Sequence, residues 1–65
     1  MLYKFEYISD FGKILQGDCI YATCDEDAFL MATARAKLRH GELFGLHEVA
    51  GTADDGTDLI RPVNF

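Results

Sequence analysis

The chain has 65 residues, and six Lys plus Arg against eleven Asp plus Glu give it a net charge of −5. A chain this short closes one hydrophobic core, so residues 1–65 are expected to form a single small domain. The 49% hydrophobic content excludes a disordered chain, the apolar runs are too short to cross a membrane, and the acidic balance argues against direct binding of nucleic acid, which depends on cationic contacts to phosphate.

Residues 2–22 predict a β-hairpin. Leu2–Ile8 alternates aromatic with charged side chains, which is the period-2 pattern of a half-buried strand. Ser9–Gly12 supplies turn residues, and Lys13–Ala22 forms the returning strand. Gly17 marks a candidate bulge that would switch the inward face of this second strand. Two sets of side chains therefore compete for the inside: Leu15, Cys19 and Tyr21, or Ile14, Ile20 and Ala22.

The segment Cys24–His40 predicts the one helix. Thr23 and Glu26 have the spacing of a capping box, in which the two side chains accept hydrogen bonds from free amide groups at the helix start. Acidic residues fall in the first turn and basic residues in the last, which complements the helix dipole. Gly41 follows where a left-handed residue commonly ends a helix.

Two further strands are expected after the helix. Gly45–Ala50 predicts the third strand, Ala53–Gly56 contains an Asp-Gly turn, and Thr57–Val63 predicts the fourth strand. Pro62 has no N–H to donate, so it places the last strand at a sheet edge or ends it. The sequence therefore predicts an α+β fold in the order β-β-α-β-β, with a four-stranded, mostly antiparallel sheet and one helix packed on one face.

The predicted helix carries more apolar surface than one sheet covers. At about 3.6 residues per turn, one stripe contains Ala28, Phe29, Ala32 and Ala36, and a second contains Leu30, Met31, Ala34 and Leu38. Two interpretations of the second stripe stay open. Either the loop at Glu42–Gly45 or the tail at Val63–Phe65 covers it, or it contacts a partner or a second copy of the chain.

The same topology is expected to gather acidic residues into one pole. The turn at Asp54 and Asp55 would lie near the acidic helix start at Asp25, Glu26 and Asp27, with Asp58 close behind. Helix capping and ordinary turn chemistry explain these residues without a ligand. Docking to a basic patch on a partner is a second interpretation. A calcium site is a third, although the spacing matches known calcium loops poorly.

The cysteines and histidines do not form a recognisable metal site. The Cys19–Cys24 and His40–His47 spacings do not match compact zinc motifs, and a continuous helix holds Cys24 and His40 roughly 24 Å apart. Cys19 is expected in the core as a small apolar side chain. The sequence predicts no cofactor and no enzymatic activity, because it offers no nucleophile–base set and no phosphate loop. Two cysteines and no recognisable secretory segment favour a cytoplasmic location with reduced thiols.

The stretch Ile20–Phe29 runs from a strand ending in Tyr-Ala through an acidic turn into an Ala-rich helix. It resembles a unit in small phage and prophage proteins, and looks like the strand-to-helix step of the short inhibitor by which some short-tailed coliphages shut down host RNA polymerase. The chain is also similar in size and charge to several phage inhibitors of bacterial defence complexes. The resemblance implies that the protein binds a larger host machine and blocks it, and it carries over no contact residues.

These observations lead to one main functional hypothesis. The protein is expected to be a small acidic, non-enzymatic interaction module of phage or mobile-element origin, which binds and inhibits a host nucleic-acid-handling complex through its acidic pole and second apolar stripe. The alternative is a structural homo-oligomer, such as a homodimer, without inhibitory activity. The residues expected to contact the partner are Asp25, Asp27, Asp54, Asp55, Leu30 and Leu38.

Overall fold

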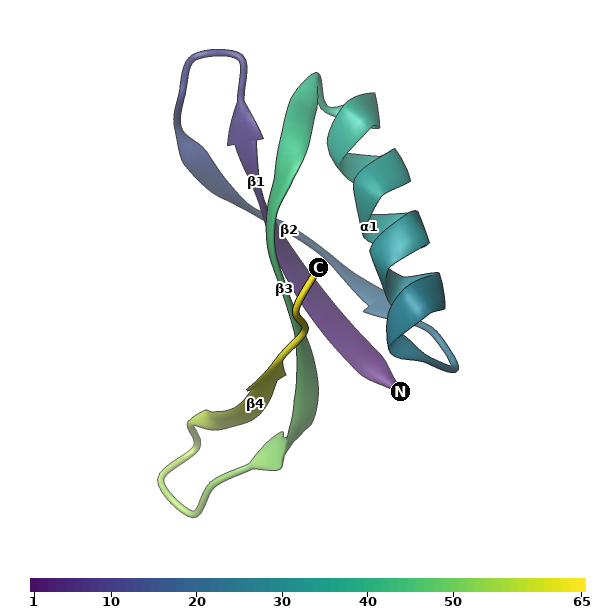
Figure 1. Cartoon of the computed structure of the whole chain (residues 1–65). Coiled ribbons are helices and arrows are strands. Elements are labelled where there is room, and N and C mark those ends of the chain that lie inside the picture. The colour runs from purple at the N-terminus through teal and green to yellow at the C-terminus, as the bar shows by residue number, and fades with distance from the viewer.

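A computed structural model describes residues 1–65 and contains four strands and one helix. The elements follow one another as β1 (Leu2–Ser9), β2 (Ile14–Tyr21), α1 (Asp25–Leu38), β3 (Gly41–Thr52) and β4 (Asp58–Pro62). All neighbouring strands are antiparallel and form one sheet in the order β2-β1-β3-β4. The helix lies along one face of this sheet (Figure 1). The predicted α+β fold and element order are confirmed, and β4 lies at an edge and ends at Pro62.

The two hairpins extend toward opposite ends of the molecule. Figure 1 shows the β1–β2 turn at the same end of the molecule as the last turn of α1, whereas the β3–β4 turn projects beyond the start of the helix and away from it. The molecule is accordingly elongated, with principal extents of 37 × 24 × 17 Å. The end that carries the β3–β4 turn has no helix over it (Figure 1).

The core is a row of aromatic rings on β1 packed beneath small side chains of α1. Its fully or almost fully buried members are Tyr3, Phe5 and Tyr7 of β1, Ala28, Ala32 and Ala36 of α1, Ile20 of β2 and Leu46 of β3. Alternate residues of a strand share one face, and residues four apart in a helix share one face, so each set forms a continuous row. The alanines allow the helix axis to come close to the sheet, and the rings fill the space between them.

A bulge in β2 decides which of its side chains point inward. Lys4 pairs with Cys19 and Glu6 pairs with Gln16, so one residue of β1 faces two residues of β2. The bulge predicted at Gly17 is therefore confirmed. It brings one member of each competing set to the inner face, because Ile20 pairs with Tyr3 and Leu15 pairs with Tyr7. A Cβ at Gly17 would overlap the ring of Phe5, so only glycine fits there without displacing the ring.

The predicted capping box is wrong. The helix starts at Asp25 with Cys24 as its N-cap, and no side chain bonds to the free amides there. Thr23 instead donates its hydroxyl to Asp27 Oδ2 at 3.2 Å. The backbone N–H of Ala22 is bonded to the carbonyl of Met1, so strand pairing holds the chain extended up to this point and delays the helix.

The helix also ends differently from the prediction. His40, and not Gly41, takes the left-handed conformation, with φ of 58°. Gly41 already pairs with Ser9 in β3, and a Cβ there would lie 2.6 Å from the carbonyl oxygen of Ile8. The third strand thus starts four residues before the predicted Gly45 and runs to Thr52, so Glu42–Gly45 is strand rather than loop.

We predict that Gly17→Ala lowers the free energy of unfolding by about 1–3 kcal/mol, because the added methyl group overpacks the ring of Phe5. Urea unfolding followed by circular dichroism measures the change. Gly51→Ala is the matched control, since the nearest atom to its new Cβ would be 3.9 Å away and its φ is not positive. Equal unfolding midpoints for the two variants would contradict the packing of Phe5 against Gly17.

Candidate functional site

The outward face of α1 carries an uncovered apolar stripe, formed by Leu30, Ala34 and Leu38 and called the α1 stripe below. Leu30 is 65% exposed and Leu38 is 80% exposed. Their spacing of four residues aligns them on the side away from the buried alanines. Neither of the two segments that would cover them in the first of the open interpretations does so. Residues 42–45 belong to β3, and the tail places Phe65 against Phe29 with ring centroids 5.1 Å apart.

Two shallow grooves flank Leu30, each with a volume of about 360 Å³. The first, called the tail groove, lies between α1 and the C-terminal residues Val63–Phe65, with Asp25 and Glu26 also in its lining. The second, called the strand groove, lies between α1 and the segment that follows β2, and its lining includes Tyr21 and Met31. Leu30 lines both grooves and forms the ridge between them.

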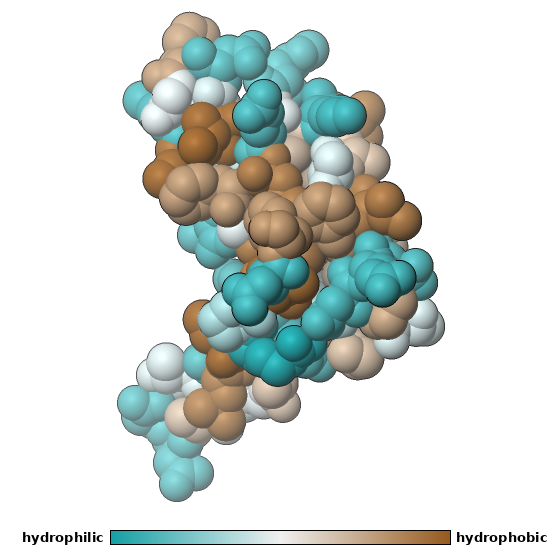
Figure 2. Space-filling view, in the orientation of Figure 1, coloured by the Kyte–Doolittle hydropathy of each residue, from teal (hydrophilic) through white to brown (hydrophobic).

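Exposed apolar surface is extensive on the whole molecule. Only 8 of 65 residues are buried, while eleven large apolar side chains are exposed. Figure 2 shows hydrophobic residues forming a band across the middle of one face, from the side of the β1–β2 hairpin to the side of α1. Apolar surface of this extent, bordered by charged residues, is typical of a protein that contacts another macromolecule.

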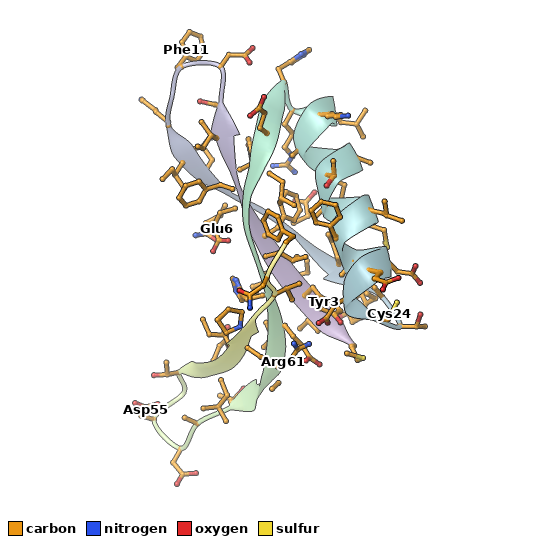
Figure 3. All side chains as sticks on the ribbon, viewed as in Figure 1. Tyr3, Glu6, Phe11, Cys24, Asp55 and Arg61 are labelled. Atoms are coloured by element: carbon orange, nitrogen blue, oxygen red, sulfur yellow. The ribbon has the colours of Figure 1, made fainter.

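A hydrogen-bonded network joins the start of α1 to three strands. Asp25 accepts from the hydroxyl of Tyr3 at 2.7 Å and from both terminal nitrogens of Arg61, at 2.7 and 3.1 Å. Arg61 also donates its Nε to Glu48 Oε1 at 2.9 Å. The paired contact of a guanidinium with both carboxylate oxygens has strong geometric specificity. This network connects α1 with β1, β3 and β4, and Figure 3 shows Tyr3 and Arg61 beside the helix start at Cys24.

The network shifts the ionisation of its members in opposite directions. The bonds from Arg61 and then from Tyr3 lower the pKa of Asp25. Burial, followed by the bond to Asp25, raises the pKa of Tyr3 to about 12. The bonds to Asp25 and Glu48 raise the pKa of Arg61. Asp25 therefore stays ionised and Tyr3 stays neutral, and both oxygens of Asp25 are engaged within the protein.

The predicted single acidic pole is wrong. Asp54 and Asp55 lie in the turn at the tip of the β3–β4 hairpin, and Figure 3 shows Asp55 far from Cys24 at the start of α1. The hairpin projects away from the helix instead of folding back toward it (Figure 1). Asp58 forms a salt bridge with Lys4 at 3.2 Å. No three His, Cys, Asp or Glu side chains are placed together to hold a metal ion.

The other predicted contact residues fall into two groups. Asp27 is exposed at the start of α1, next to Leu30 in the lining of the strand groove. Asp55 accepts from the backbone N–H of Thr57 at 2.9 Å, and this bond lowers the pKa of its carboxyl. The structure thus brings Asp27 together with Leu30, and leaves Asp54 and Asp55 at a separate tip.

The cysteines lie on the surface. Cys19 was predicted in the core, but it pairs with Lys4 on the sheet face away from α1 and is exposed. The bulge at Gly17 causes this, because it gives the inner face to Ile20. Cys24 is exposed at the N-cap of α1. His47 lies on the outer face of the sheet, with Nδ1 3.6 Å from Glu6 Oε1.

Sequence reasoning missed Arg61 and Tyr21. Arg61 is the only Lys or Arg in the otherwise acidic segment 41–65, and this isolation was a usable signal for a buried or bonded role. Tyr21 is 75% exposed and lines the strand groove, whereas the sequence pattern offers it only as one of the candidates for the inside of the second strand. Its direction depends on the bulge in β2, which the sequence left open.

Comparison with models of protein families, with curated proteins and with solved structures finds no match to this chain. The resemblance of Ile20–Phe29 to small phage inhibitors therefore stays a prediction. The only helix has 14 residues, which makes it too short to cross a lipid bilayer.

We predict that stability falls as the pH rises from 10 toward 12, because the folded state keeps Tyr3 neutral. The pKa of Tyr3 is raised from 10 to about 12, so its contribution is complete below pH 10 and is lost as the pH passes the folded value. Urea unfolding at several alkaline pH values measures this loss. Tyr3→Phe should remove part of the dependence, and Tyr21→Phe, at an exposed position, should leave it unchanged. Identical alkaline profiles for all three proteins would contradict the assignment to Tyr3.

Proposed function

We propose that the protein is a small interaction module that acts by binding another protein chain through the α1 stripe. The observation that carries this proposal is the outward position of Leu30 and Leu38, which no segment of the chain covers. Full burial of an exposed leucine side chain stabilises a protein or complex by about 1.5–3 kcal/mol. A partner that covers Leu30 and Leu38 would therefore gain binding free energy from both side chains.

The charges beside the stripe favour a partner with complementary charge. Glu26 and Asp27 are exposed near Leu30, and the chain as a whole carries a charge of −5. Complementary potentials speed association and select the partner. That the module has no enzymatic activity stays a prediction from the sequence.

We propose that the partner of this module is a larger host complex that handles nucleic acid. Such a complex has a cationic surface where it holds phosphate groups, and Asp54 and Asp55 at the projecting hairpin tip have the charge to meet it. Inhibition of that complex, and a phage or mobile-element origin, belong to the same proposal. Their support is the acidic charge and the resemblance of Ile20–Phe29 to small phage inhibitors.

We predict that Leu30→Asp with Leu38→Asp abolishes partner binding and leaves the fold intact. Both side chains are exposed, so we expect a loss of unfolding free energy of about 1 kcal/mol or less. Affinity capture from bacterial lysate measures binding, and circular dichroism measures folding. Phe11→Asp, an exposed apolar position in the β1–β2 turn, is the control for a general loss of surface hydrophobicity. Unchanged capture by the double variant would refute the role of the α1 stripe.

We predict that Asp54→Lys with Asp55→Asn weakens binding to a cationic target, and that high salt has the same effect on the unmodified chain. Asn is chosen at position 55 because its side-chain oxygen can still accept from the backbone N–H of Thr57. Exposed charges are screened over about 8 Å at physiological ionic strength, so the salt effect should be steep. Binding that neither salt nor the charge change affects would exclude docking through the hairpin tip.

A further inference from the structure

We propose that the α1 stripe is the contact surface of a symmetric homodimer, in which two copies of the chain pair their helices antiparallel. The dimer rests on the proposed function, since the stripe must be a binding surface. It adds the identity of the bound chain and the geometry of the contact. Three features of α1 point to a second copy: a projecting side chain with a matching groove, a small residue midway between them, and charges of opposite sign at the two ends.

The first feature is a projecting side chain at one end of the helix and a groove at the other. Leu38 is the most exposed large apolar residue of α1, and it lies eight residues beyond Leu30, about 12 Å along the axis. The strand groove beside Leu30 has apolar walls that include Tyr21 and Met31, and its volume of about 360 Å³ accommodates a leucine side chain. An antiparallel pair places each Leu38 over the other copy's groove, and a parallel pair does not.

The second feature is the residue at the centre. Ala34 lies midway between Leu30 and Leu38 and is exposed on the same face. A two-fold axis through this position places Leu30 of each copy opposite Leu38 of the other. The methyl side chain of Ala34 lets the two helices approach closely at the crossing point.

The third feature is the distribution of charge along the exposed side of α1. Glu26 and Asp27 lie at its start and Lys37 lies near its end, and none of the three forms a salt bridge within the chain. Glu26 and Lys37 fall on the same side of the stripe, because eleven residues make about three turns. Antiparallel pairing about Ala34 leaves Glu26 roughly 7.5 Å along the axis from the partner's Lys37, within the reach of the two side chains.

Parallel pairing would be electrostatically unfavourable. It would bring the acidic first turns of the two helices together, and the two parallel helix dipoles would repel each other. The same surface is thus complementary to itself in one orientation, which is the requirement for a two-fold contact. The helix has 14 residues and is about 21 Å long. A contact between two helices of this length buries an area at the low end of the range for specific interfaces. We therefore expect a dissociation constant of the dimer in the micromolar range.

The experiment pairs two charge reversals. Sedimentation velocity of the unmodified chain, from about 1 μM to about 1 mM, should show a concentration-dependent shift from one to two times 7.3 kDa. Glu26→Lys and Lys37→Glu should each weaken the dimer at least about tenfold, because each places like charges together across the contact. An equimolar mixture, with one variant isotope-labelled, should form the mixed dimer in native mass spectrometry, since both contacts are then of opposite charge.

Controls separate the contact from folding. Lys13→Glu makes the same charge change in the β1–β2 turn and should leave the dimer unchanged, and circular dichroism should show all variants folded. Leu38→Asp should give a folded monomer. An unmodified chain that stays monomeric at all concentrations, or a dimer that survives Leu38→Asp and both reversals, would overturn the proposal.

The outcomes also distinguish this dimer from the proposed function. A monomeric chain whose capture of a different protein is lost with Leu30→Asp and Leu38→Asp would keep the α1 stripe as a binding surface and overturn only the second copy as its occupant. A chain that neither dimerises nor depends on these leucines for any capture would overturn both.

Discussion

The close packing of three alanines against three aromatic rings determines much of the remaining structure. Tyr3, Phe5 and Tyr7 point to the same face of β1, and the helix approaches them through Ala28, Ala32 and Ala36. The large side chains of this core come from the sheet and the small ones from the helix. As a consequence, the leucines of α1 have no place in the core, and Leu30 and Leu38 face outward.

The Asp25 network fixes the helix start against the far edge of the sheet. Arg61 comes from β4, which pairs only with β3, and its bonds to Asp25 and Glu48 connect that edge strand to the layer above. Tyr3 takes part from β1, one of the two inner strands of the sheet. The polar ends of buried groups are satisfied in this way at the one place where the aromatic row reaches the helix start. Asp25 is thus held within the fold, whereas Asp27 is exposed, and its one side-chain hydrogen bond comes from the neighbouring Thr23.

The sequence was sufficient for the features that depend on local pattern. Alternation along Leu2–Ile8, helix-forming residues after Thr23 and the Asp-Gly turn at Asp55 each define an element without reference to distant residues. Prediction from the sequence failed for features that depend on contacts between residues far apart in the chain. The hydrogen bond between Ala22 and Met1 keeps the chain extended, so the helix starts later than predicted. Gly41 pairs with Ser9, so the segment predicted as a loop is part of a strand. The β3–β4 hairpin projects away from the helix, which separates the acidic residues of its turn from those at the helix start. The α1 stripe was visible as a surplus of apolar residues, but only the path of the tail shows that it is uncovered.

Self-association and docking to a larger target are compatible in this fold. The helix occupies one side of the molecule, and the β3–β4 hairpin projects away from it (Figure 1). A dimer built on α1 would leave both acidic tips free, one on each copy. Two tips that engage one cationic surface bind more tightly than a single tip, because the second contact forms at high effective concentration. A core of eight buried residues is also small, so covering the α1 stripe would add stability that the isolated chain lacks.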